Sequence, residues 1–163
     1  ATGTGRTLQQ IQSALPEVEL YGIDLSGSYL KQASKYLSSR SGDLVQLTRG
    51  NAENMPYSSS SFQALTCVFL FHELPRDARQ NVLNECFRLL EPGGTLILAD
   101  SIQLKDSPKF TAIMENFHKI FHEPYYRDYI IDDIDLRFEE SGFSSITSET
   151  HFMTKVWKAH KPL

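Results

Sequence analysis

The sequence has few cysteines, no long hydrophobic run and no excess of basic residues. Its 163 residues include two cysteines, Cys67 and Cys86, whose separation is typical neither of a disulfide framework nor of a zinc site. We interpret both as buried thiols in a reducing compartment, which predicts a cytoplasmic protein. No apolar run approaches the ~20 residues that cross a bilayer, so we expect a soluble chain without a membrane span.

The charge balance is slightly acidic. Sixteen Lys and Arg stand against 20 Asp and Glu, giving a net charge of −4. A broad basic surface that attracts a phosphate backbone is therefore not expected, and nucleic acid is not predicted as a partner. With 40% hydrophobic and 22% charged residues, the composition is near the globular average and predicts a single domain spanning residues 1–163.

Helical and strand-like segments alternate along the first hundred residues. Spacings of three and four between apolar residues predict helices, and short apolar runs predict buried strands. In chain order we expect a helix at 7–15, a strand at 20–24, a helix at 26–37, a strand at 44–48, a loop at 50–61, a strand at 64–71, a helix at 75–90 that ends at residues 91–94, and a strand at 95–99. This alternation predicts an α/β fold with a doubly wound, mostly parallel sheet.

The last third of the sequence is different in character. Aromatic residues crowd positions 101–131, and aromatic segments inserted after a strand often cover a pocket, so we interpret this stretch as a lid over a substrate. A helix at 131–140 is expected next. Two strand-like runs at 144–152 and 155–160 follow closely and predict an antiparallel C-terminal hairpin.

The residues that follow the predicted strands are candidates for a ligand site, because open α/β sheets bind ligands beyond the carboxyl ends of their strands. Gly3 and Gly5 allow backbone N–H groups to approach a ligand at a helix N-terminus. Asp24 ends the next strand, where a carboxylate can accept hydrogen bonds from a ribose diol. Together they predict a nucleoside site, although a tight turn and a helix cap explain each feature taken alone. Leu8 stands where a dinucleotide fingerprint has its third glycine, which disfavours NAD.

Four ordered motifs resemble those of class I S-adenosylmethionine-dependent methyltransferases. The similarity is greatest to small-molecule enzymes of the ubiquinone/menaquinone C-methyltransferase type, whose fold is Rossmann-like. The motifs are residues 1–5 (ATGTG), 22–26 (GIDLS), 50–57 (GNAENMPY) and 89–96 (LLEPGGTL).

The resemblance implies S-adenosylmethionine as the cofactor and assigns residues to its parts. These are Ala1, Gly3 and Gly5 along the methionine moiety, Asp24 at the ribose, Leu25 over the adenine with Asn51 and Ala52 at its edge, and Phe69 beside the sulfonium. Asn51 stands where the family has Asp. The family's first strand is also missing before Ala1, so we expect further N-terminal residues that include a β-branched strand ending in an acid.

Methyl transfer from a sulfonium is an in-line displacement that depends mainly on alignment in a dry pocket. For an acidic acceptor, His72 and Glu73 are the candidate general bases, because they follow the buried strand at 64–71. In the alternative interpretation, His72 only begins a loop and Glu73 is an acidic residue at the start of the next helix. His122, Tyr125 and Tyr126 are candidate acceptor-binding residues, with ordinary core aromatics as the alternative.

The spacing of Glu115, His118 and His122 could present ligands to a metal, but an exposed polar helix face explains the same residues, and we predict no metal.

The sequence as a whole predicts a methyltransferase that acts on a small apolar or aromatic metabolite. The alternatives are a nucleotide-binding oxidoreductase and a non-catalytic domain with a methyltransferase-like fold. The sequence does not indicate the oligomeric state.

Overall fold

The computed structural model describes residues 1–38 and 45–163. These residues separate into two compact units, 1–56 and 57–163, and each unit is described by itself. Leu44, the first residue of the predicted strand at 44–48, lies outside the described residues. That residues 1–163 form one domain stays a prediction.

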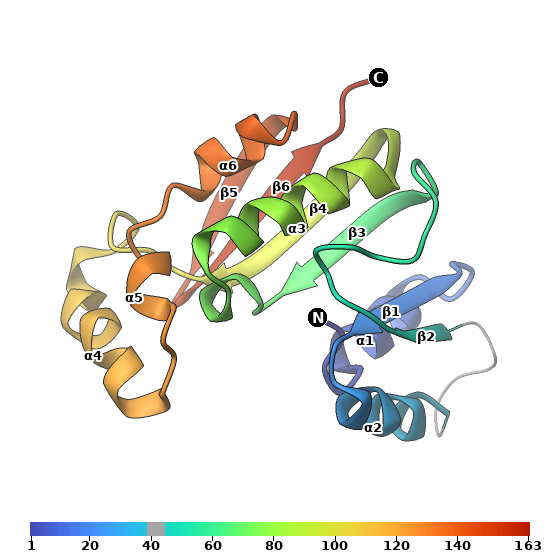
Figure 1. The fold of residues 1–163 in the computed structure, drawn as a ribbon, viewed down its shortest axis with the longest axis horizontal. Coiled ribbons are helices and arrows are strands. Elements are labelled where there is room, and N and C mark those ends of the chain that lie inside the picture. Colours follow the sequence, from blue (N-terminus) through green and yellow to red (C-terminus); the bar gives the residue numbers. More distant parts are fainter. Residues whose placement is uncertain (39–44) are drawn as a thin grey trace. The chain divides into compact units, whose positions relative to one another are not determined.

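The first unit contains two helices and a parallel pair of strands (Figure 1). Its elements are α1 (Arg6–Ala14), β1 (Leu20–Asp24), α2 (Gly27–Ser38) and β2 (Val45–Arg49). The pairing runs in register from Leu20 opposite Val45 to Asp24 opposite Arg49. Ser26 caps α2, because its side-chain oxygen accepts a hydrogen bond from Tyr29 N at 3.3 Å. The elements predicted here from periodicity are confirmed.

Helix α1 packs so closely on β1 that one position of the strand has no room for a side chain. A Cβ atom on Gly22 would lie 2.7 Å from Leu8 Cδ1 and 2.8 Å from Leu47 Cδ2. Gly5 precedes α1 with φ of 82°, in the left-handed region that favours glycine. Packing thus requires glycine at position 22, and the left-handed backbone favours glycine at position 5. With these two glycines the N-terminal turn lies directly against β1.

The second unit contains a four-stranded sheet in the order β3-β4-β6-β5. Strands β3 and β4 are parallel, and the pairs β4–β6 and β5–β6 are antiparallel. The elements are β3 (Phe62–Val68), η1 (Phe71–Glu73), α3 (Arg76–Leu89), β4 (Leu90–Ser101), η2 (Pro108–Phe110), α4 (Thr111–Phe121), α5 (Tyr126–Tyr129), α6 (Ile134–Glu140), β5 (Ser144–His151) and β6 (Thr154–His160).

The core of the second unit lies between this sheet and the helices α3 and α6, which run across one of its faces (Figure 1). Alternate residues of the central strands point into it, as the period of two in a β-strand requires. Its fully buried apolar members include Leu83, Leu89, Leu96, Leu98, Ile134, Phe138, Trp157 and Ala159. The mixed α/β class, with parallel strand pairs and a C-terminal antiparallel hairpin, is confirmed.

Three predicted boundaries are wrong. The strand expected at 64–71 ends at Val68, because Phe69 takes a left-handed conformation with φ of 50°. The helix expected at 131–140 begins at Ile134, after Asp133 accepts a hydrogen bond from Leu136 N. Residues 91–94, expected to separate helix from strand, belong to the irregular start of β4, where the register with β3 shifts.

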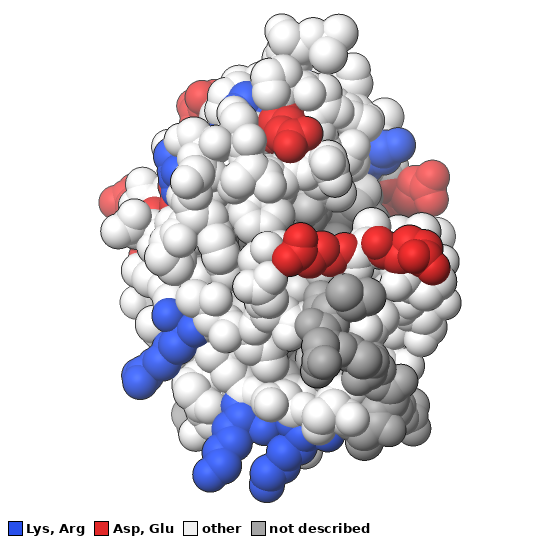
Figure 2. Space-filling view, turned by 90° about the vertical axis from the view of Figure 1, so that its right-hand side faces the viewer, with Lys and Arg blue, Asp and Glu red and all other residues white. Residues whose placement is uncertain are grey.

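Both cysteines are free and buried, as predicted. Burial raises the pKa of the Cys67 thiol to about 11, so it stays protonated at neutral pH. Among the described residues, no helix has the length and apolar character needed to cross a membrane. On the face drawn in Figure 2, acidic and basic side chains both occur and most of the surface is neither, which agrees with the small net charge.

Candidate active-site residues

In the first unit, the N-terminal glycine turn and the strand-end acid are in direct contact. Gly3 N donates a hydrogen bond to Asp24 Oδ2 at 2.8 Å, and Ser26 N donates to Asp24 Oδ1 at 2.9 Å. Thr2 N donates to Ile23 O at 3.0 Å and fixes the turn against the strand. A carboxylate offers about four lone-pair sites, so Asp24 can still accept hydrogen bonds from a ligand.

Gly3 faces open space. Its φ is 53°, and a Cβ atom built on it would have no heavy atom within 4 Å. Packing therefore gives no reason for a glycine here, in contrast to Gly22. A backbone turn that is open on one side and anchored to a carboxylate on the other can receive a polar ligand in close contact with the main chain.

The other predicted adenine-side residues also lie near the carboxyl ends of the two strands. Gly50 N donates to Asp24 O at 3.1 Å and joins the two strand ends. Leu25, which follows Asp24, is an exposed apolar side chain with 68% of its surface accessible. Asn51 is exposed, and its Oδ1 already accepts a hydrogen bond from Glu53 N at 3.0 Å. Ala52 is half-buried. The structure thus gathers the predicted cofactor residues of the first unit at one edge of its strand pair.

In the second unit, Asp100 organises the turn that follows β3. This fully buried carboxylate accepts four hydrogen bonds, two of them from backbone N–H groups of the turn, Leu70 at 3.1 Å and Phe71 at 2.7 Å. The others come from Ser101 N and from His72 Nδ1, both at 2.7 Å. Asp100 lies near the end of β4, and its role as the anchor of His72 is not predictable from the sequence.

His72 is a mostly buried side chain with a defined orientation. Only 13% of the side chain is accessible. Its ring packs edge-on against the rings of Phe69, Tyr126 and Tyr129, with distances of 6.1–6.3 Å between ring centroids. Because Asp100 accepts a hydrogen bond from Nδ1–H, Nε2 is the ring nitrogen that can exchange a proton with a ligand. Burial disfavours the charged ring, but the hydrogen bond to Asp100 and the nearby carboxylates outweigh this effect and raise the pKa of His72.

The two other predicted residues of this turn are exposed. Phe69 is held in its left-handed conformation by a hydrogen bond from its N to Ala99 O at 2.8 Å, and about half of the residue is accessible. A bulky residue with positive φ is a backbone outlier, and such strain concentrates at functional sites. Glu73 Oε1 lies 4.0 Å from His72 Nε2, and its side chain is mainly exposed.

The predicted lid is helical and contains η2, α4 and α5 (Figure 1). Tyr126 is 1% exposed, lies 4.5 Å from the Phe117 ring and has its hydroxyl 2.8 Å from Ser101 Oγ. Burial raises its pKa. In contrast, Tyr125 is exposed, and His122 is exposed in a left-handed conformation at the end of α4. Of the three predicted acceptor residues, Tyr126 packs against His72, and the other two face solvent.

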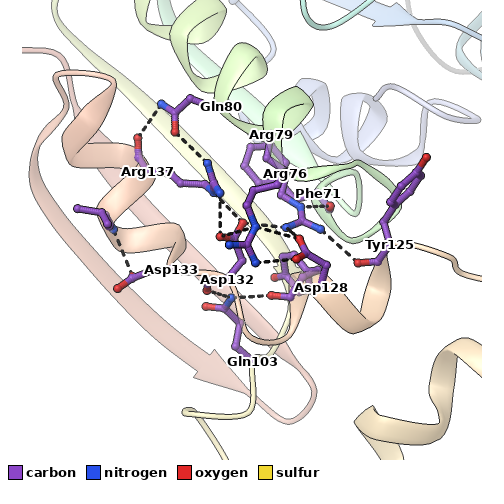
Figure 3. A network of polar contacts seen from close by, with 12 residues as sticks. Phe71, Arg76, Arg79, Gln80, Gln103, Tyr125, Asp128, Asp132, Asp133 and Arg137 are labelled. Carbon is purple, nitrogen blue, oxygen red and sulfur yellow. Dashed lines mark hydrogen bonds and ion pairs between the residues drawn. The ribbon is translucent and has the colours of Figure 1, made fainter.

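A buried arginine connects the His72 turn to the lid (Figure 3). Arg79 on α3 is fully buried and donates to Phe71 O at 2.9 Å and to Tyr125 O at 3.2 Å. Its Nη1 lies 2.9 Å from Asp128 Oδ2 and 2.8 Å from Asp132 Oδ2. One side chain thereby holds the backbone of the His72 turn, at Phe71, and the backbone of the lid, at Tyr125.

Arg79 was missed at the sequence level, although a signal exists. It shares a helical stripe with Val82, Leu83 and Cys86, all of which are buried. An arginine in the middle of an apolar stripe indicates a buried ion pair, but its partners lie about fifty positions further along the chain and cannot be identified from spacing.

A mixed α/β fold with a glycine turn beside a strand-end carboxylate is that of the nucleotide-binding α/β enzymes. The model of a family described as a methyltransferase domain matches residues 1–94, and the chain belongs to this family. Neither alternative, the oxidoreductase or the non-catalytic domain, is supported by the comparisons.

Curated relatives include two demethylmenaquinone methyltransferases. The one from Thermotoga maritima is 31% identical over 118 residues, which cover 72% of this chain and 48% of that protein. The one from Anoxybacillus flavithermus is 26% identical over 175 residues, covering 96% of this chain and 73% of that protein. The chain thus spans about half the length of the first of these relatives.

The fold is shared with a solved structure, that of Haemonchus contortus phosphoethanolamine N-methyltransferase 2 in complex with S-adenosyl-L-methionine. The TM-score is 0.76 at 14% identity, over 99% of this chain and 47% of the other.

Proposed function

We propose that this chain binds S-adenosylmethionine and transfers its methyl group to a small apolar or aromatic metabolite. The observation that carries the proposal is the hydrogen bond from Gly3 N to Asp24 Oδ2, since it brings together the two groups expected to hold the donor. Membership of the methyltransferase family and the ligand of the structural neighbour support it.

The donor-binding residues have distinct tasks. Asp24 accepts hydrogen bonds from the ribose hydroxyls, and the exposed Leu25 covers the adenine. Asn51 and Ala52 stand at the adenine edge. The methionine part lies along Ala1, Gly3 and Gly5. When bound, the donor supplies a methyl group on a sulfonium that is already activated for displacement.

The acceptor is deprotonated by His72. Its Nε2 takes the proton, and Asp100 holds the Nδ1–H and stabilises the charged ring that results. The acceptor atom then forms a bond to the methyl carbon as the bond to sulfur breaks, which leaves S-adenosylhomocysteine. His122, Tyr125 and Tyr126 border the acceptor. The relatives' names suggest a quinol ring as acceptor, whose acidic O–H gives His72 a proton to take.

The proposal is tested with the full-length protein, labelled S-adenosylmethionine and a demethylmenaquinol analogue. For His72→Gln we expect kcat to fall by roughly 10²- to 10⁴-fold, the usual contribution of a positioned general base, with donor binding unchanged. His151→Gln is the matched control, because that histidine is exposed in β5. A His72→Gln enzyme with kcat within twofold of wild type removes His72 from the chemistry. Absence of methyl transfer to any small aromatic acceptor by the wild type contradicts the proposed function.

A cytoplasmic location and the absence of nucleic acid partners belong to the same proposal. The free, buried thiols of Cys67 and Cys86 support a reducing compartment.

A further inference from the structure

One histidine and two glutamates of the second unit converge at the turn that follows β3. The candidate ligand atoms of His72, Glu73 and Glu123 all lie within 4.8 Å of one another. His72 and Glu73 belong to η1, and Glu123 comes from the turn between α4 and α5. This cluster differs from the helical series Glu115, His118 and His122, and sequence spacing does not reveal it, because the lid brings Glu123 back to η1.

The histidine of this cluster is oriented as a metal ligand would be. Its Nδ1 lies 2.7 Å from Asp100 Oδ1, and Asp100 is fully buried. Metal-binding histidines almost always donate their second ring N–H to a carboxylate or carbonyl, which fixes the ring and increases the basicity of the ligating nitrogen. Nε2 is therefore the nitrogen that is directed to a ligand.

The charges of the cluster also favour a cation. The carboxylates of Glu73, Glu123 and Asp100 lie around the His72 imidazole, with Asp100 Oδ1 at 2.7 Å from Nδ1 and Glu73 Oε1 at 4.0 Å from Nε2. Arg79, the buried basic side chain that bonds to Phe71 O in the same turn, is already engaged with Asp128 and Asp132. A cation bound at Nε2 is stabilised by the negative charge of these carboxylates.

We propose that His72, Glu73 and Glu123 form a binding site for a divalent transition-metal cation, with Zn²⁺ as the best match. One imidazole and two carboxylates suit Zn²⁺ better than Mg²⁺ or Ca²⁺, which prefer oxygen ligands alone. Three protein ligands leave a fourth position open to a small molecule.

The geometry requires a small adjustment. Ligand atoms about 2.0–2.2 Å from a tetrahedral ion are separated by roughly 3.4 Å, so a pair 4.8 Å apart must approach by about 1.4 Å. Small side-chain rotations of the two glutamates can supply this approach, since the Glu73 side chain is mainly exposed and Glu123 lies on a turn. The ion and a proton compete for Nε2, so a metal-loaded chain cannot use His72 as a base. The proposal does not depend on methyl transfer, since binding is measured without donor or acceptor.

The test is a titration of the full-length protein with Zn²⁺ by calorimetry and with Co²⁺ by visible absorption, in a buffer that does not bind metals. We expect one ion per chain and the visible bands of four-coordinate Co²⁺. Glu123→Gln removes one ligand from an exposed turn without disturbing the core, and it should weaken binding on the order of 10- to 100-fold, comparable to losses measured around metal sites.

His151→Gln is the matched control, because His151 Nε2 lies 3.4 Å from Glu149 in an exposed pair that could bind an ion adventitiously. Its affinity should stay within twofold of wild type. An absence of stoichiometric binding overturns the proposal, and so does a Glu123→Gln chain that binds as tightly as wild type. A loss confined to His151→Gln also overturns it, since the ion would then be bound in β5.

Discussion

Replacing Arg79 by methionine should destabilise the second unit strongly. The guanidinium is fully buried and contacts Phe71 O, Tyr125 O, Asp128 and Asp132. Removing one partner of a buried ion pair typically costs about 3–5 kcal/mol, because buried groups are left without compensation.

The surrounding residues place the expected cost at the lower end of that range. Asp132 keeps two hydrogen bonds from Arg137, at 2.6 and 2.9 Å, and Asp128 keeps Arg76 at 2.6 Å. The two backbone carbonyls also keep one hydrogen bond each, Phe71 O from Leu74 N at 3.1 Å and Tyr125 O from Tyr129 N at 2.9 Å, so the loss is that of Arg79's own hydrogen bonds. We therefore expect the free energy of unfolding to fall by about 3 kcal/mol.

Urea unfolding followed by circular dichroism measures this loss. Arg76→Met is the control, because Arg76 pairs with the same Asp128 but is about half exposed, and exposed pairs contribute at most ~1 kcal/mol. If Arg79→Met unfolds within 1 kcal/mol of wild type, or no further from it than Arg76→Met, the buried network does not hold the turn to the lid.

Two other predictions concern ionisable groups. Burial opposes the ionisation of Asp132, but hydrogen bonds from Arg137 and Arg79 outweigh this effect and lower its pKa. Its contribution to the free energy of unfolding is therefore complete above about pH 4 and is lost as the pH falls through the pKa of the folded state. Asp132→Asn should flatten the decline in urea midpoint between about pH 5 and 2, and an unaltered slope would contradict this. For Cys67, burial raises the pKa to about 11, so a thiol reagent at pH 8 should label neither cysteine in the native chain and both after unfolding. Rapid labelling of the native chain would show that the thiols are accessible.

Local patterns predicted most of the fold because they report on burial directly. The stripe through Leu30, Ala33 and Leu37 predicts α2, and all three side chains are buried. The errors arose where a single backbone conformation decides the boundary. Phe69 is as apolar as a strand residue, and its positive φ, which ends the strand early, has no signature in residue type.

The candidate site was predictable only in part. Gly3 and Asp24 were identified because turn and strand-end chemistry has a recognisable spacing, and the structure joins them by a hydrogen bond. His72 was identified by its place after a strand, but Asp100, which orients it, is linked through tertiary pairing between β3 and β4. Glu123 reaches the same place through the lid. Contacts of this kind depend on how separate elements pack, which periodicity does not encode.

The proposed function requires that the glycine turn and Asp24 bind one methyl donor. Calorimetric titration of the full-length protein with S-adenosylhomocysteine tests it directly, with Glu17→Gln as an exposed acidic control in the same unit. Asp24→Ala should lose about 1.5–3 kcal/mol of binding free energy, on the order of 10- to 150-fold in Kd, because charge-assisted hydrogen bonds to the ribose are removed. An Asp24→Ala protein that binds the ligand as tightly as Glu17→Gln would contradict the account.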